Sequence, residues 1–256
     1  MSPPPPEVLV RPDAGSLART VAEQLVARLS AAQSASGTAS VVLTGGGVGV
    51  AVLEQVASLA PAEAGGPVDW SAVDVWWGDE RFVPADDEAR NEGAARRALL
   101  DVVGVPAERV HPMPASDAGF RTPEDAAAWY AGELAAAAAP GGDLPRFDVL
   151  LLGMGPEGHT ASIFPGSPAV HDERPVVAVR NCPKPPPTRV SLGFSAINAA
   201  DEVWLVAAGA EKAPAVAQAL AGASPDELPV AGVHGRRATR WLLDAAAAGK
   251  LPASPG

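Results

Sequence analysis

FDVLLL, at residues 147–152, is an apolar run that leads directly into a glycine-rich stretch beginning at Gly153. A strand that is apolar almost throughout is typical of the centre of a parallel sheet, because helices cover both of its faces. In sheets of this kind, ligands bind in the crevice beyond the carboxyl ends of the strands. The run therefore predicts a central strand, and it directs the search for a functional site to the residues that follow it.

Helical and strand patterns alternate on both sides of this run. Leucine and valine recur every four positions over residues 16–29, which predicts an amphipathic helix. Further strands are predicted at residues 40–44, 73–77, 176–179, 189–192 and 202–208. Further helices are predicted at residues 49–59, 91–101, 123–139 (with Thr122 as its N-cap and Pro123 as its first residue), 211–220 and 235–248. The alternation predicts an α/β fold of three layers, in which helices flank a mostly parallel, twisted, Rossmann-like sheet.

Composition narrows the class of protein further. The chain has 256 residues, a formal net charge of −11 and a hydrophobic fraction of 47%. A chain this apolar can bury enough surface to fold, and we expect a single domain over residues 1–256 with loose tails at about 1–6 and 251–256. The acidic balance argues against nucleic acid and anionic membranes as partners, because both bind basic surfaces. It does not exclude a small anionic ligand, which a few local cations can hold.

The sequence carries no signal for export or membrane insertion. Cys182 is the only cysteine, so neither an intrachain disulfide nor a cysteine metal cluster can form. The residues after Met1 lack the basic and apolar regions of a signal peptide, and no apolar run reaches the roughly 18 residues of a membrane span. We therefore expect a cytoplasmic protein, and we expect it to be a monomer.

A glycine loop, Thr44-Gly45-Gly46-Gly47, follows the strand predicted at residues 40–44. Glycines let backbone N–H groups approach an anion, and the helix predicted next would add the positive end of its dipole. A tight turn without a ligand is the alternative. The loop is not a Walker motif, because no Gly-Lys-Ser/Thr follows it.

A charged cluster, Asp79-Glu80-Arg81, follows the strand predicted at residues 73–77. Arg81 offers the planar fork that binds phosphate or carboxylate, and Asp79 is suited to position a sugar hydroxyl or a water. A surface turn in which Glu and Arg pair locally is the alternative.

The stretch GMGPEGHT, residues 153–160, follows the central strand. Its glycines match the dinucleotide-binding fingerprint, but Pro165-Gly166 breaks the chain before a crossover helix can form, so we reject that function. A histidine titrates near neutral pH, and Glu157 can orient His159 or hold its proton. His159 is therefore the candidate base, and a structural histidine with satisfied hydrogen bonds is the alternative.

Three cations, Lys184, Arg189 and Lys212, lie near the remaining strand ends. Each taken singly is more often a solvated surface charge. In an acidic chain with few lysines, we treat them as candidate ligands of a substrate.

The other histidines and the serines favour no further chemistry. His111, His171 and His234 lack the spacing of metal ligands, so we expect them to be structural or at the surface and expect no metal site. Ser162 and Ser167 are not in a Gly-x-Ser-x-Gly elbow, which gives a serine hydrolase only weak support.

Taken together, these stretches resemble the 6-phosphogluconolactonase family. The matching segments are TGGG (44–47), VWWGDERFVPADDEARN (75–91), FDVLLLGMGPEGHTASIFPGSPA (147–169), PPPTRVSLGFSAIN (185–198) and GAEKAPAVAQAL (209–220). They span most of the chain in the family's order. WGDER-x-VP and GHTAS-x-FPG are specific signals of this family, unlike the glycine patterns alone.

The resemblance implies a fold related to glucosamine-6-phosphate deaminase and ribose-5-phosphate isomerase. It implies hydrolysis of 6-phospho-D-glucono-1,5-lactone to 6-phospho-D-gluconate, the second step of the oxidative pentose phosphate pathway, with no cofactor. It implies that His159 is the base, with Glu157 beside it. The substrate and its phosphate would be held by Gly45, Gly46, Gly47, Asp79, Arg81, Lys184, Arg189 and Lys212, converging on one pocket.

This chain departs from the family's pattern at two positions. Glu157 stands where the family usually has Asp, and Val48 stands where it usually has Ser or Thr. Two other functions are possible on this fold. A deaminase or isomerase on the same fold typically carries an acid five residues after the motif histidine, where this chain has Phe164. A non-catalytic sugar-phosphate-binding module usually follows a basic helix-turn-helix, which the acidic start of this chain does not resemble.

Overall fold

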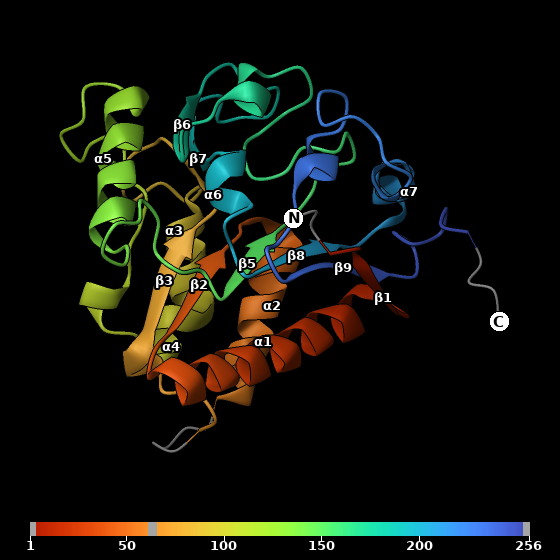
Figure 1. Ribbon diagram of the computed structural model, residues 1–256, viewed down its shortest axis with the longest axis horizontal. Helices are drawn as coiled ribbons and strands as arrows, with labels where there is room; N and C mark the ends of the chain where they lie inside the picture. Colours follow the sequence, from red (N-terminus) through yellow and green to blue (C-terminus); the bar gives the residue numbers. More distant parts are fainter. Residues whose placement is uncertain (1–3, 61–65, 253–256) are drawn as a thin grey trace.

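The computed structural model describes residues 4–60 and 66–252, and its centre is a six-stranded sheet (Figure 1). The strands lie in the order β1-β9-β8-β5-β2-β3, and every neighbouring pair is parallel. Their bounds are β1 (Glu7–Arg11), β2 (Ala39–Leu43), β3 (Val73–Trp77), β5 (Val149–Leu152), β8 (Glu202–Ala207) and β9 (Ala238–Asp244). The FDVLLL run therefore supplies a central strand, and each residue of β2, β5 and β8 is buried.

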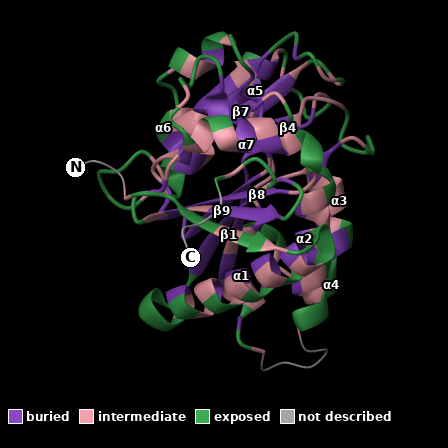
Figure 2. Cartoon of the chain, turned by 90° about the vertical axis from the view of Figure 1, so that its right-hand side faces the viewer, coloured by how far each residue is buried: buried purple, intermediate pink, exposed green. Residues whose placement is uncertain are grey.

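Helices and a second, smaller sheet complete the three layers. Figure 2 shows α1 (Ala14–Ser36) and α2 (Gly46–Leu59) on one side of the large sheet and α5 (Pro123–Ala136), α6 (Phe194–Ile197) and α7 (Ala213–Leu220) on the other. Two short helices, α3 (Asn91–Ala95) and α4 (Asp101–Val103), are joined by a π-helical stretch over Arg96–Leu100. The predicted three-layer α/β fold is confirmed. Among the helices that the structure describes, none combines the length and apolar character needed to cross a bilayer.

The smaller sheet is antiparallel and contains β4 (Asp79–Arg81), β7 (Arg189–Leu192) and β6 (Val176–Val179), in that order. The last two strands have the bounds that the sequence predicts. β4 was not predicted, because three successive charged residues have little intrinsic strand preference. Its register places Arg81 directly opposite Arg189, so that two cations meet across one pair of strands.

The prediction of a helix at residues 235–248 is wrong, because Ala238–Asp244 forms strand β9. This strand lies between β1 and β8 and pairs with both. The chain enters it through a tight turn at Gly235, where a Cβ atom would lie 2.1 Å from the Ala238 carbonyl oxygen. Pairing with two strands that are distant in the sequence overrides the helical preference of the alanine-rich segment.

The first strand, β1, was also not predicted, because its burial depends on partners far along the chain. Leu9 packs against the core, whereas Val8 and Val10 are exposed on the edge of the sheet. Of the predicted loose tails, residues 4–6 and 251–252 form no helix or strand. Residues 1–3 and 253–256 lie outside the described residues.

Leu150→Ala tests the central position of β5. Leu150 is fully buried between two neighbouring strands, so its truncation leaves a cavity that the sheet cannot close. We expect the free energy of unfolding to fall by about 2–5 kcal/mol, measured by urea denaturation. Val102→Ala is the control, because Val102 is 62% exposed and its truncation should change stability by less than about 0.5 kcal/mol. Equal effects of the two variants would contradict this placement of the core.

Candidate active site

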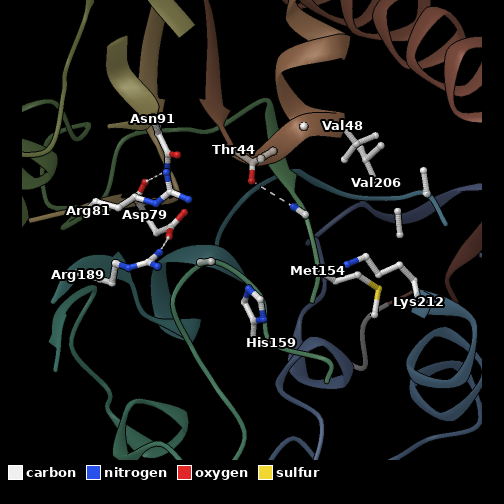
Figure 3. A pocket seen from close by; sticks show the side chains of 17 residues that line it. Thr44, Val48, Asp79, Arg81, Asn91, Met154, His159, Arg189, Val206 and Lys212 are labelled. Atoms are coloured by element: carbon white, nitrogen blue, oxygen red, sulfur yellow. Dashed lines mark hydrogen bonds and ion pairs between the residues drawn. The ribbon is translucent and has the colours of Figure 1, made fainter. Parts of the chain in front are cut away.

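A pocket of about 250 Å³ opens at the carboxyl ends of β2, β5 and β8 (Figure 3). Strand β2 has β3 as its neighbour on one side and β5 on the other. The chain first runs from β2 to β3 and later returns to the opposite side of β2 with β5, so the direction of the strand order reverses between β2 and β5. This reversal is the usual position of a ligand site in an open parallel sheet. The lining residues are Thr44, Gly45, Gly46, Gly47, Val48, Asp79, Arg81, Asn91, Gly153, Met154, His159, Ala161, Arg189, Val206, Ala207, Ala208 and Lys212.

The glycine loop forms the wall between β2 and α2. The hydroxyl of Thr44 accepts a hydrogen bond from the backbone N–H of Gly153 across 3.2 Å, which ties the ends of β2 and β5 together. Gly46 has a φ of +82°, and a Cβ atom on Gly45 would lie 1.9 Å from Oδ1 of Asn91. Both positions therefore need glycine. The loop places the amino terminus of the 14-residue helix α2, with its unpaired N–H groups, at the pocket.

Glu80 fixes the loop that carries Arg81 and Asn91, although it does not line the pocket itself. Its carboxylate is almost fully buried and accepts 2.8 Å hydrogen bonds from the backbone N–H groups of Arg81, Asn91 and Glu92. Burial raises the pKa of Glu80, and the Arg90 guanidinium and these N–H groups act against the rise. The charge of Glu80 thus caps the start of α3 instead of facing a ligand.

Asp79, in strand β4, joins three other segments of the chain at the pocket wall. Its Oδ2 accepts a hydrogen bond of 2.6 Å from the buried hydroxyl of Ser162, and the same oxygen lies 3.8 Å from Nη1 of Arg189. Its backbone carbonyl accepts from Nδ2 of Asn91 across 2.9 Å. Asp79 is therefore held in place by groups from three segments of the chain, of which Figure 3 shows Asn91 and Arg189.

The two arginines of the small sheet are only partly satisfied by the protein. Arg81 donates from Nη1 to the Ala89 carbonyl, and its buried Nε has no partner among the described residues. Arg189 donates to the carbonyls of Pro186 (2.7 Å), Lys184 (3.2 Å) and Pro185 (3.3 Å). Burial and the nearby Arg81 charge lower the pKa of Arg189, while Asp79 opposes this. Like charges placed opposite one another across strands are destabilising, so the arrangement favours an anionic ligand.

His159 and Glu157 form a hydrogen-bonded pair beside the pocket. Nδ1 of His159 lies 2.9 Å from Oε1 of Glu157, and the ring stacks on Phe164 with centroids 4.4 Å apart. A carboxylate at Nδ1 fixes the proton there and leaves the lone pair of the neutral imidazole on Nε2. The pair needs Gly155, because a Cβ atom there would lie 2.1 Å from Nδ1 and 2.3 Å from Oε2 of Glu157.

Burial and neighbouring charges shift the pKa of His159 in opposite directions. Burial lowers the pKa of His159, and the Lys184 charge lowers it further, whereas Glu157 and Asp79 raise it. The net pKa is lower than that of an ordinary histidine. The imidazole is therefore neutral, and available as a base, at neutral pH.

The pocket brings together most of the residues that the sequence singled out, but not all of them. Those that line it are Gly45, Gly46, Gly47, Asp79, Arg81, His159, Arg189 and Lys212. In Figure 3, Arg81, Asp79 and Arg189 lie on the left of the cavity, and Lys212 lies on the right beside apolar residues. Glu157 and Lys184 do not line it. The Lys184 ammonium lies 2.9 Å and 3.1 Å from the two carboxylate oxygens of Glu157.

Sequence reasoning missed Asn91, Ser162 and Ala161. Asn91 and Ser162 act through contacts with Asp79, 12 and 83 residues away, and no local pattern reveals such contacts. Ala161 lines the pocket with a φ of +47°, a conformation that a non-glycine residue rarely adopts. Over residues 4–60 and 66–252, no three His, Cys, Asp or Glu side chains form a group that could hold a metal ion.

The chain is similar to known proteins over nearly its whole length. A family model described as glucosamine-6-phosphate isomerases/6-phosphogluconolactonase matches residues 12–241. A 6-phosphogluconolactonase of Mycobacterium tuberculosis is 51% identical over 243 residues, covering 94% of this chain and 96% of the relative. One of Streptomyces coelicolor is 50% identical over 253 residues, covering 97% and 96%.

Solved structures share the fold. The 6-phosphogluconolactonase of Trypanosoma brucei has a TM-score of 0.82 at 29% identity and covers 98% of this chain and 100% of its own. A monomeric glucosamine-6-phosphate deaminase has a TM-score of 0.79 at 18% identity and covers 95% and 99%, a likeness that concerns the fold alone.

Gly155→Ala tests the contact between His159 and Glu157. The added methyl group occupies the space of both side chains, so we expect the pair to separate and the pKa of His159 to fall further, because the Glu157 charge that raises it moves away. An NMR titration of the His159 imidazole measures the shift. Gly132→Ala is the control, because a Cβ atom at Gly132 in α5 meets nothing within 4 Å. An unchanged titration of His159 in Gly155→Ala would argue against the pair.

Proposed function

The chain belongs to the glucosamine-6-phosphate isomerase/6-phosphogluconolactonase family and acts as a lactone hydrolase, and we propose that His159 is the general base of the reaction. The substrate is 6-phospho-D-glucono-1,5-lactone, and the product is 6-phospho-D-gluconate. One observation carries the role of His159. A neutral imidazole, held at Nδ1 by Glu157, shares a pocket with Arg81, Arg189 and Lys212. We propose that this hydrolysis serves as the second step of the oxidative pentose phosphate pathway.

The reaction is the addition of water to an activated ester. Nε2 of His159 takes a proton from the water as its oxygen bonds to C1 of the lactone, which gives a tetrahedral oxyanion. The bond between C1 and the ring oxygen then breaks, and the imidazolium returns its proton to that oxygen. General base catalysis of this kind contributes roughly 10²–10⁴-fold.

Glu157 supports both halves of this cycle. Its carboxylate holds the proton on Nδ1 in the neutral state, so that Nε2 faces the water as an acceptor. When the ring is charged, the same carboxylate stabilises the imidazolium. The longer side chain of Glu, relative to the Asp usual in the family, thus still reaches Nδ1 here, at 2.9 Å.

The cations and the amino terminus of α2 hold the anionic parts of the substrate. Arg189 and Lys212 bind the phosphate, and the binding energy from this remote group positions C1 near His159. The tetrahedral oxyanion also needs donors that are in place before the reaction, and the N–H groups at Gly46 and Gly47 and the partly unpaired Arg81 are of that kind. Val48 contributes an apolar side chain at this point and no hydroxyl.

Phe164 favours a lactonase over the deaminase and the isomerase. In the deaminase pattern, an acid occupies this position. Here an aromatic ring, 5% exposed, stacks on His159 and offers no group that can carry a proton. A binding-only module would need neither the oriented base nor its carboxylate. Glucosamine 6-phosphate assayed beside freshly made 6-phosphogluconolactone, corrected for spontaneous hydrolysis, distinguishes these functions.

His159→Ala tests the general base. We expect kcat for the phosphorylated lactone to fall by about 100-fold or more, with the fold intact by circular dichroism. His171→Ala is the matched control, because the His171 side chain is 74% exposed and pairs with the surface residue Asp226. Turnover by His159→Ala within a few-fold of the unaltered enzyme would sink the assignment.

Arg189→Ala and Lys212→Met test the phosphate site. Each removes a cation from the pocket wall, and we expect KM for the phosphorylated lactone to rise by about tenfold to 100-fold, the range of a charge-assisted hydrogen bond. KM for unphosphorylated gluconolactone should change little. If a variant weakens both lactones equally, that residue does not contact the phosphate.

A further inference from the structure

Lys184 occupies a position that the substrate-binding role expected from the sequence does not explain. It does not line the pocket, and its ammonium instead lies against Glu157, within hydrogen-bond distance of both carboxylate oxygens. Oε1 of Glu157 is shared, since it is 2.9 Å from the Lys184 ammonium and 2.9 Å from Nδ1 of His159. Lys184, Glu157 and His159 therefore form one continuous chain of contacts that ends at the base.

The backbone around Lys184 is held as firmly as its side chain. The carbonyls of Lys184, Pro185 and Pro186 all accept hydrogen bonds from the Arg189 guanidinium. The N–H of Cys182 donates to the Pro187 carbonyl across 2.9 Å and closes the loop. The loop thus directs its carbonyls toward the Arg189 guanidinium and the Lys184 ammonium toward the Glu157 carboxylate.

We propose that Lys184 is a positioning residue, which holds the Glu157 carboxylate against Nδ1 of His159 and offsets its charge so that the imidazole stays an unprotonated base. This inference rests on the proposed function, because it assigns a role toward the same base. A glutamate has one more rotatable bond than an aspartate, so a second anchor restricts the carboxylate that His159 needs. The anchor also prevents an uncompensated carboxylate from drawing a proton onto Nε2.

The charges around His159 agree with this role. Burial would raise the pKa of Glu157, but the hydrogen bond from Lys184 is foremost among the contacts that hold it below its ordinary value. Lys184 also lowers the pKa of His159 directly. Asp79 acts on the ring in the opposite direction, and the cations Arg81, Arg189 and Lys212 line the same pocket as His159.

Lys184→Met removes the charge and keeps the length of the side chain. Because Lys184 is 44% exposed, the change leaves no buried cavity. We expect kcat for the phosphorylated lactone to fall by about threefold to tenfold, a part of what general base catalysis supplies, with KM unchanged. The acid limb of the profile of kcat/KM against pH should move to higher pH, because the pKa of His159 rises when the Lys184 charge is lost.

Two controls separate charge from structure. Lys184→Arg keeps a cation that can reach the carboxylate and should restore kcat and the acid limb. Lys250→Met removes an exposed charge near the end of the chain and should change neither. In a Glu157→Gln background, Lys184→Met should lower kcat much less than it does alone, because the anchoring of the carboxylate acts through Glu157. The direct effect of the Lys184 charge on the pKa of His159 should persist.

Three outcomes would overturn the proposal. A rise in KM with kcat unchanged would make Lys184 a substrate ligand. Unchanged kinetics in Lys184→Met would show that Lys184 has no role in the reaction. A fall in kcat that is as large in the Glu157→Gln background as in the unaltered protein would show that Lys184 does not act through Glu157.

An NMR titration of His159 in the unaltered protein and in Lys184→Met tests the same contact without substrate, the signal being assigned with His159→Ala. The pKa of His159 should rise in Lys184→Met, and an unchanged value would overturn the role of Lys184 whatever the substrate is. Failure of the proposed function would instead appear as absent lactonase activity in the unaltered protein, or as full activity in His159→Ala.

Discussion

The hydrogen bond from the Gly153 N–H to the Thr44 hydroxyl joins the carboxyl ends of β2 and β5, and the site is built outward from it. Strand β2 leads into the glycine loop and the amino terminus of α2, and strand β5 leads into the loop that carries His159. Since the strand order reverses between these two strands, their following segments diverge and leave a crevice. One contact across 3.2 Å thus ties the loop before α2 to the loop that carries His159.

The acidic net charge of the chain is compatible with a cationic pocket, because some of the buried carboxylates accept hydrogen bonds from backbone N–H groups outside the pocket. Glu80 accepts hydrogen bonds from two backbone N–H groups at the start of α3 and from that of Arg81 in β4. Asp244 accepts the N–H of Gly209, at the turn before Lys212, and the N–H of Ala247. These carboxylates stabilise the loops that carry the cations, and neither of them lines the pocket. The charge of −11 therefore describes the chain as a whole, while the pocket wall carries Arg81, Arg189 and Lys212.

Apolar runs made most of the fold predictable, and long-range pairing explains what was missed. Residues 73–77, 176–179 and 189–192 have the predicted bounds, because each is a short run with apolar residues at its core. The segment at 235–248 was taken for a helix because its alanines dominate locally, whereas β9 owes its conformation to β1, more than 200 residues earlier, and to β8. The site residues divide in the same way, into those that local patterns reveal and those that depend on long-range contacts. Glycines and charges after strands pointed to the pocket, but the contact of Lys184 with Glu157, 27 residues apart, depends on how two loops meet.

The two arginines that face each other across β4 and β7 show why such a pocket has a cost in stability. The register of the strands fixes their backbone positions opposite one another, so the two side chains start from neighbouring points of the small sheet. Asp79 lies 3.8 Å from one of them and only partly offsets the repulsion, because its oxygen is already engaged by Ser162. A protein that needed only to fold would place an opposite charge, or no charge, at one of these positions. An anion held between the two guanidinium groups would relieve this repulsion, so the cost in stability and the capacity to bind an anion have the same origin.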